Sequence, residues 1–142
     1  RIQQSIGEVR EANDVDSVLD AILHMATEVG VDHLECRLAI STKEGLLRYS
    51  TRHPPGAGDM GHVGRYMLTF PLDGHRGRHE LTGELRVAWN APDELVQVPE
   101  AGSYDWLAMV VRDRVLDIHA ESDALPMRPR IVSESLPPSG EI

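Results

Sequence analysis

Seven histidines are the residues of this 142-residue chain with the most evident capacity for chemistry. His75 and His79 enclose the segment HRGRH, where a turn would bring two imidazoles within reach of one zinc ion. A third ligand would have to come from the preceding loop, which holds His53, Asp59 and His62. Two arginines lie between the paired histidines, and their positive charges oppose the binding of a dication. We therefore predict exposed loop histidines and no metal or other cofactor.

The sequence shows no distinctive pattern for catalysis by paired carboxylates or by a serine or cysteine nucleophile. Glu80 and Glu84 share one face of a predicted strand, which is typical of a solvent-facing surface. No Gly-x-Ser-x-Gly segment occurs, and the glycines of residues 56–64 lack the spacing of a phosphate-binding loop. Cys36 falls at an inward-facing strand position, where a buried and unreactive thiol is the common case. We predict no catalytic residues.

The charge balance restricts the partners. The chain carries 23 acidic and 14 basic residues, a net charge of −9 with neutral histidine. Nucleic acid favours a basic surface, so we predict that it is not a partner. No run of about 18 apolar residues occurs, so we do not expect this chain itself to span a membrane. Four arginines lie near one another in the sequence, and we interpret them as scattered surface residues: Arg65, Arg76, Arg78 and Arg86.

Hydrophobic periodicity predicts the elements that would position these residues. Asp14 can cap a helix that buries one apolar stripe and ends at Gly30, where a helix needs a left-handed residue. Apolar and polar residues then alternate over residues 34–41, which indicates a half-buried strand. A polar turn at residues 41–45 and a second strand at residues 46–52 complete a predicted hairpin.

Two more strands are predicted after the loop of residues 53–64. They cover residues 65–72 and 80–89, and a polar turn at residues 73–79 joins them. After a loop at residues 90–102, Ser103 can cap a last helix of about residues 104–120. This order indicates an α+β domain. We expect a mostly antiparallel sheet of about four or more strands, with the N- and C-terminal helices packed on one face.

The ends of the chain are expected to differ from this domain, which covers residues 14–121. Residues 1–13 predict a connector helix whose stripe of Ile2, Ile6 and Val9 has no evident partner inside the chain, so we expect a homodimer through that stripe. Residues 122–142 are rich in proline and polar residues, which predicts a disordered tail. Because the chain begins with Arg1 and not with methionine, we expect it to be a piece of a longer protein.

Two stretches of the sequence resemble the ends of a GAF domain. The segment EVGVDHLECRLAI resembles its opening helix, glycine and first strand. The segment LTGELRVAWN, followed by YDWLAMVVRDRVLDIHA, resembles its last strand and closing helix. The resemblance covers about residues 12–121 and implies a GAF-like fold. More narrowly, the sequence resembles the soluble C-terminal region of some bacterial polyprenyl-phosphate N-acetylhexosamine-1-phosphate transferases, which are membrane glycosyltransferases that use UDP-sugars.

The resemblance implies a function. We expect a non-catalytic regulatory or assembly domain that contacts the host transmembrane domain at the cytoplasmic face of the inner membrane, while the host carries the transferase reaction. The alternative is a small-ligand sensor GAF domain of a bacterial signalling protein, with its ligand between the sheet and residues 53–64. A concave apolar cavity would favour the sensor, and a filled sheet face would favour the assembly domain. A metal-dependent enzyme built on the histidine loops ranks third. The chain lacks the extra helix and the long loops of ligand-binding GAF domains, so the resemblance implies no binding residues.

Overall fold

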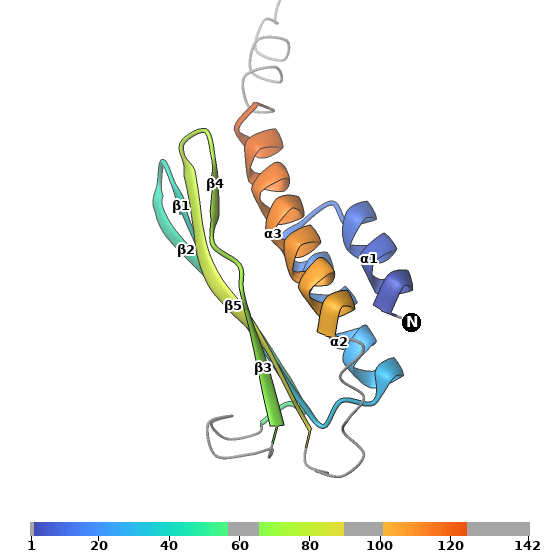
Figure 1. Cartoon of the computed structure of the whole chain (residues 1–142). Coiled ribbons are helices and arrows are strands. Elements are labelled where there is room, and N and C mark those ends of the chain that lie inside the picture. The colour runs from blue at the N-terminus through green and yellow to red at the C-terminus, as the bar shows by residue number, and fades with distance from the viewer. Residues whose placement is uncertain (1, 57–65, 90–100, 125–142) are drawn as a thin grey trace, which may run out of the picture.

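A computed structural model describes residues 2–56, 66–89 and 101–124 of the chain (Figure 1). Its elements follow one another in the order α1 (Ile2–Glu11), α2 (Val15–Val29), β1 (His33–Thr42), β2 (Gly45–His53), β3 (Tyr66–Pro71), β4 (Gly74–Arg76), β5 (His79–Trp89) and α3 (Ala101–Ala124). The predicted α+β class is therefore confirmed, with helices at both ends of an antiparallel sheet. Residues 57–64 and 90–100, which belong to the predicted loops, and Arg65, which begins a predicted strand, lie outside the described residues.

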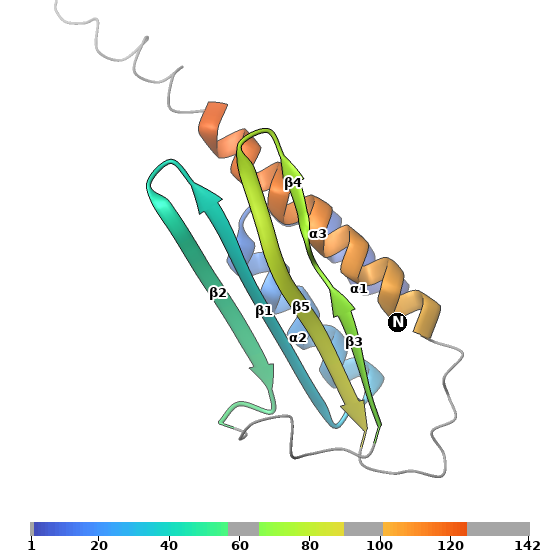
Figure 2. The same ribbon diagram turned by 60° about the vertical axis from the view of Figure 1, so that its left-hand side comes forward.

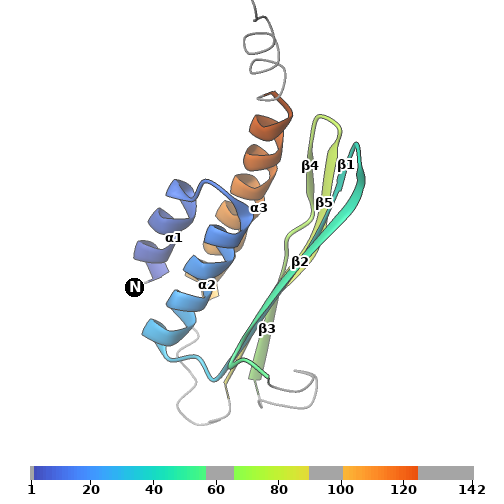
Figure 3. The same ribbon diagram turned by 180° about the vertical axis from the view of Figure 1, so that it is seen from behind.

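The sheet has the strand order β2-β1-β5-β3, and β4 also pairs with β5. Every pair is antiparallel. The three helices lie on one face of the sheet, and the described elements leave the other face open (Figures 1 and 3). Figure 2 looks onto the open face, with the helices behind the strands. The described elements thus form two layers, and the sheet has one face that is packed and one that no described element covers.

Both ends of α2 form as the sequence predicts. The backbone N–H of Ser17 donates to the Asp14 carboxylate at 2.8 Å, and this hydrogen bond lowers the pKa of Asp14. At the other end Gly30 adopts φ 81°, and its N–H donates to the carbonyl of Ala26 at 3.0 Å. These caps satisfy backbone groups that a helix end leaves unpaired, and so fix the length of α2.

Helix α1 packs within the domain. Its stripe of Ile2, Ile6 and Val9 is at most 4% exposed, because α1 lies against α2 and α3. The Nε of Arg114 on α3 also donates to the carbonyl of Ala12 at 2.8 Å, just after α1 ends. The expectation that this stripe has no partner inside the chain is wrong. Helical periodicity shows that a face is buried, but it does not show which element covers it.

The segment of residues 73–79, predicted as a turn, contains strand β4. Strands β3 and β4 both pair with β5, and they do so in one continuous register, in which Pro71 pairs with Glu84 and Gly74 with Leu81. The interruption between them lies at Asp73, whose carboxylate accepts the backbone N–H of Gly83 at 3.2 Å. The real turn has two residues, between the paired Arg76 and His79, and its glycine at the first position has φ 59°. A glycine there suits a tight hairpin turn, so the polar segment HRGRH pairs instead of forming a loop.

Helix α3 extends beyond the predicted residues 104–120 at both ends. Its last residues carry no apolar stripe, which is why periodicity placed the end too early. Residues 122–124 of the predicted tail therefore belong to α3, and residues 125–142 lie outside the described part of the chain. Among the described helices, none combines the length and the apolar character that crossing a membrane requires.

Candidate functional site

The two faces of the sheet have opposite chemistry. The face under the helices is apolar and buried, with side chains such as Leu34, Leu81 and Leu85 fully buried. The open face carries charged residues in rows that cross the strands. By the strand register, three successive rows from β2 through β1 to β5 are Arg52–Glu35–Arg86, Ser50–Arg37–Glu84 and Arg48–Ala39–Thr82. We call this group of four arginines and two glutamates, with the small residues beside them, the arginine face.

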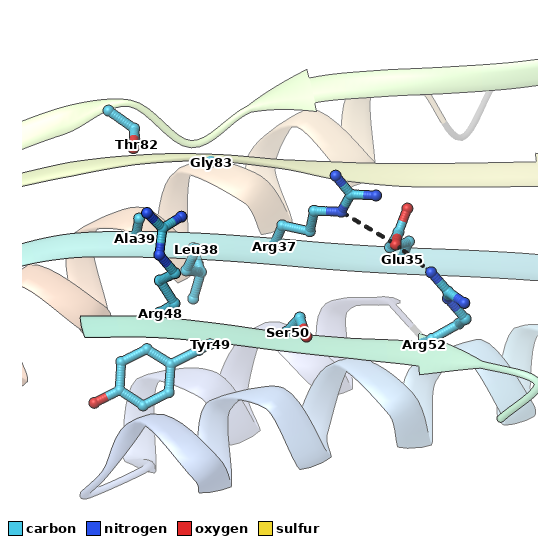
Figure 4. A pocket seen from close by; sticks show the side chains of 10 residues that line it. All are labelled: Glu35, Arg37, Leu38, Ala39, Arg48, Tyr49, Ser50, Arg52, Thr82 and Gly83. Carbon is cyan, nitrogen blue, oxygen red and sulfur yellow. Dashed lines mark hydrogen bonds and ion pairs between the residues drawn. The ribbon is translucent and has the colours of Figure 1, made fainter. Parts of the chain in front are cut away.

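Glu35 is the buried centre of the arginine face. Its side chain is 4% exposed, although it lies on the open side of the sheet. Arg52 Nη2 donates to its Oε2 at 2.8 Å, and Arg37 Nε donates to the same oxygen at 3.2 Å (Figure 4). Burial alone raises the pKa of Glu35, but the two hydrogen bonds and the two positive charges outweigh it, so the pKa lies below the usual value. Glu35 is thus held ionised between two arginines.

The second oxygen of the Glu35 carboxylate, Oε1, is buried and has no hydrogen-bond partner among the described residues. A carboxylate oxygen removed from water without a partner costs free energy. The two arginines that pair with Glu35 therefore offset its burial through a single oxygen. The second pair on this face, Arg86 Nε with Glu84 Oε2 at 2.8 Å, lies on the neighbouring strand β5.

A hollow of about 380 Å³ opens beside Glu35 and its two arginines (Figure 4). Its lining includes the charged Glu35, Arg37, Arg48 and Arg52, and its floor includes small residues such as Ala39. Arg48 is exposed and forms no ion pair with any described carboxylate. The hollow exists because Ala39 and Thr82 have small side chains, while arginines stand at its borders. It therefore presents positive charge to solvent.

Gly83 fixes the floor of the hollow at strand β5. It faces Leu38 in the register, and a Cβ added there would overlap the carbonyl oxygen of Arg37. Only glycine lets the β5 backbone approach β1 this closely without a shift of one strand. The sequence LTGELRVAWN therefore needs its glycine for the shape of this face.

The predicted metal ligands are not brought together. His75 is exposed on β4, whereas His79 is 4% exposed and its Nδ1 lies 3.0 Å from the carbonyl oxygen of Ser41. The prediction that His79 is an exposed loop residue is wrong. The tight turn before it lets His79 begin strand β5, and the centroid of its ring lies 5.8 Å from that of His119. His53 ends β2, and Asp59 and His62 lie outside the described residues. Within the described residues, no group of three or more histidine, cysteine, aspartate or glutamate side chains is arranged to hold a metal ion.

Cys36 is buried on the helix side of β1, as the alternation predicts. Burial, together with the negative charge of neighbouring Glu35, raises the pKa of its thiol to about 12. A thiol with so high a pKa stays protonated near neutral pH, and the protonated form is a poor nucleophile. The interpretation of Cys36 as an unreactive core residue fits this environment.

The arginines that the sequence singled out do not form one patch. Arg76 pairs with Asp117 of α3, and Arg86 belongs to the arginine face. Arg78 lies in the β4–β5 turn, and Arg65 lies outside the described residues. Sequence reasoning missed the residues that do cluster, although a signal was present. Charged residues recur at every second or fourth position on the outward side of two adjacent strands: Glu35, Arg37, Arg48 and Arg52.

Comparison with known proteins gives little beyond this geometry. No protein-family model matches the sequence, and no curated protein does. The structure is similar to the crystal structure of the GAF domain from Acinetobacter phosphoenolpyruvate-protein phosphotransferase. That similarity covers 84% of this chain and 92% of the other, with 14% sequence identity and a TM-score of 0.47. At such values, the similarity says nothing about what this chain binds or does.

Proposed function

We propose that this chain is a non-catalytic regulatory or assembly domain, and that it binds its partner on the open face of the sheet. The observation that carries the proposal is the arginine face: a charged hollow, with Glu35 held ionised at its centre, on the side that the helices do not cover. The layer between sheet and helices is filled by apolar side chains. A charged surface over a filled core fits the docking of a partner better than the enclosure of an apolar ligand.

The small-ligand sensor is the second candidate. The volume of the hollow, about 380 Å³, favours it, because small-molecule sites have volumes of this order. Its charged lining disfavours an apolar ligand. A thermal-shift screen of polar metabolites would test this alternative. A saturable stabilisation by one of them, lost in Arg48→Glu, would favour the sensor over the assembly domain.

We further propose that the domain belongs to a polyprenyl-phosphate N-acetylhexosamine-1-phosphate transferase and contacts the transmembrane part of that host at the cytoplasmic face of the membrane. Its support is the narrower sequence resemblance to the soluble C-terminal region of such transferases, whereas the segments EVGVDHLECRLAI, LTGELRVAWN and YDWLAMVVRDRVLDIHA support the GAF-like character of residues 12–121. In such a host the membrane-embedded part performs the sugar-phosphate transfer, and the domain adjusts or assembles it.

The test uses the intact gene and the intact protein. The coding sequence around residue 1 is expected to encode several hydrophobic spans upstream, and membranes that contain the intact host are expected to transfer sugar phosphate to polyprenyl phosphate. Deleting the domain is expected to leave some transfer activity but to change its level or its assembly state. A histidine kinase or another signalling module in place of the spans would overturn the host proposal.

Homodimerisation through Ile2, Ile6 and Val9 remains a separate proposal. Because these side chains are buried against α2 and α3, α1 would have to exchange between two copies to use them at an interface. Light scattering of the purified chain tests this proposal without a mutation. A mass of twice the 15.7 kDa of one chain would support a dimer, whereas the mass of one chain at all concentrations would overturn it.

A further inference from the structure

The arginine face differs in charge from the chain that carries it. The chain as a whole has a net charge of −9, yet this face holds four arginines and two glutamates. Glu35 and Glu84 each pair with an arginine of the same face, which leaves an excess of positive charge. Since the other residues of the chain carry a net negative charge, an anionic partner would be directed to this face.

The excess positive charge is concentrated at the hollow. Arg48 stands at its border without a carboxylate among the described residues, and the side chain of Arg37 is 55% exposed even while it contacts Glu35. Arg48 lies beside the small residue Ala39, whereas the side chain of Arg37 extends along β1 toward Glu35 (Figure 4). A carboxylate placed beside Ala39 would meet the guanidinium group of Arg48, and a second carboxylate further along the strands would meet that of Arg37. Guanidinium is the side-chain group that best matches the two oxygens of a carboxylate.

The spacing of the arginines favours a ligand with several negative groups. Arg48 and Arg52 are four residues apart on β2, about 13 Å along the strand. Arg37, on the adjacent β1, pairs with Ser50 and so lies between them. A single carboxylate or phosphate cannot reach across this distance, whereas acidic residues along an extended segment can.

We infer that the arginine face docks an acidic segment of a partner protein, whose carboxylates bind Arg48, Arg37 and Arg52. This inference rests on the proposed assembly function and names the chemistry of the partner. Glu35 acts as a positioning residue, because its Oε2 holds Arg37 and Arg52 in place before the partner arrives. The acidic segment adds its own carboxylates at the side of the arginines that faces solvent.

The experiment titrates the full chain with a capped hexaglutamate peptide, followed by NMR chemical shifts and calorimetry. We expect saturable binding that weakens as salt rises, with the largest shifts at β1 and β2. Arg48→Glu should weaken binding about tenfold, because it replaces an attraction by a repulsion. The matched control is Arg78→Glu, which makes the same charge change in the β4–β5 turn and should alter affinity less than about twofold.

One further variant separates the positioning role of Glu35 from the effect of its charge. Glu35→Gln keeps the shape of the side chain but removes the charge that holds the arginines. If Glu35 only repelled the peptide, this variant would bind more tightly; if it positions Arg37 and Arg52, binding should weaken. Circular dichroism of each variant establishes that it folds before its affinity is compared.

Several outcomes would overturn the inference. One is the absence of peptide binding, and another is an equal loss of peptide affinity in Arg48→Glu and Arg78→Glu. The third is that inorganic phosphate binds to the same residues as tightly as the peptide, because this result would indicate a small-anion site. The proposed function has a separate test. If deletion of the domain changes the host while the chain ignores acidic peptides, the assembly function stands and this inference fails.

Discussion

The two faces of the sheet differ in burial and in charge. On β1, Leu34, Cys36 and Leu38 lie under the helices, and the alternating Glu35 and Arg37 lie on the open side. The packed face stabilises the fold through burial of apolar area, whereas the open face carries charged side chains. Buried apolar side chains and charged side chains of the open face are therefore separated by a single residue step along each strand. The following predictions test that separation.

The largest effect is expected from truncating the packed face. Leu85→Ala removes a fully buried side chain from β5 and should lower the free energy of unfolding by about 2–5 kcal/mol. Its neighbour on the open face provides the control, because Glu84→Ala removes only a partly exposed ion pair and should cost at most about 1 kcal/mol. Urea denaturation of both variants measures the difference. Equal losses would contradict the separation of the faces.

Thiol reactivity gives a second comparison of the faces. Cys36 should react with a disulfide reagent about a hundredfold more slowly in the native chain than in urea, because the thiol is buried and its pKa is raised to about 12. Ser50→Cys places a thiol on the open face of the adjacent strand, where it should react without unfolding. Rapid modification of native Cys36 would show that the packed face opens easily.

Glu35 is where the open face departs from an ordinary surface. Glu35→Ala leaves two arginines without their shared carboxylate and should destabilise the chain by about 1–3 kcal/mol. Glu80→Ala is the matched control, since this glutamate is exposed at the start of β5 and forms no ion pair with a described residue. If both variants unfold at the same urea concentration, the ion pairs of Glu35 with Arg37 and Arg52 add nothing to stability.

The smallest effect concerns pH. The pKa of Glu35 is lower in the native chain than its usual value of 4.5, so the native state favours the ionised form. The stability that this provides is fully present above the usual pKa and is lost as the pH falls through the lowered native pKa. Glu35→Gln should therefore make the free energy of unfolding less sensitive to acid.

The control for the pH prediction is Asp14→Asn. The pKa of Asp14 is also lowered, by the hydrogen bond from the Ser17 backbone, so part of the acid sensitivity belongs to the helix cap. Glu35→Gln and Asp14→Asn should each remove the part of the acid sensitivity that the replaced carboxylate causes. An unchanged pH profile in Glu35→Gln, measured by denaturation at several acidic pH values, would contradict the role assigned to its ion pairs.

Much of this fold could be predicted because its signals are local. A cap residue such as Asp14 and a glycine such as Gly30 act through hydrogen bonds within one helical turn. The alternation in β1 and β5 follows from the geometry of a single strand. The exposed position expected for His79 was wrong because a two-residue turn at Gly77 allowed the polar segment to pair.

The sequence by itself determined the α+β class, the ends of α2 and the inward and outward sides of the main strands. Each of these depends on residues that are neighbours along the chain. Only the tertiary structure decided that α1 packs on α3, and that arginines from two strands surround Glu35. Strand order and register bring Arg52 to Glu35 across 17 positions of sequence. Pairing between distant segments is set by the packing of the whole domain, and no local pattern contains it.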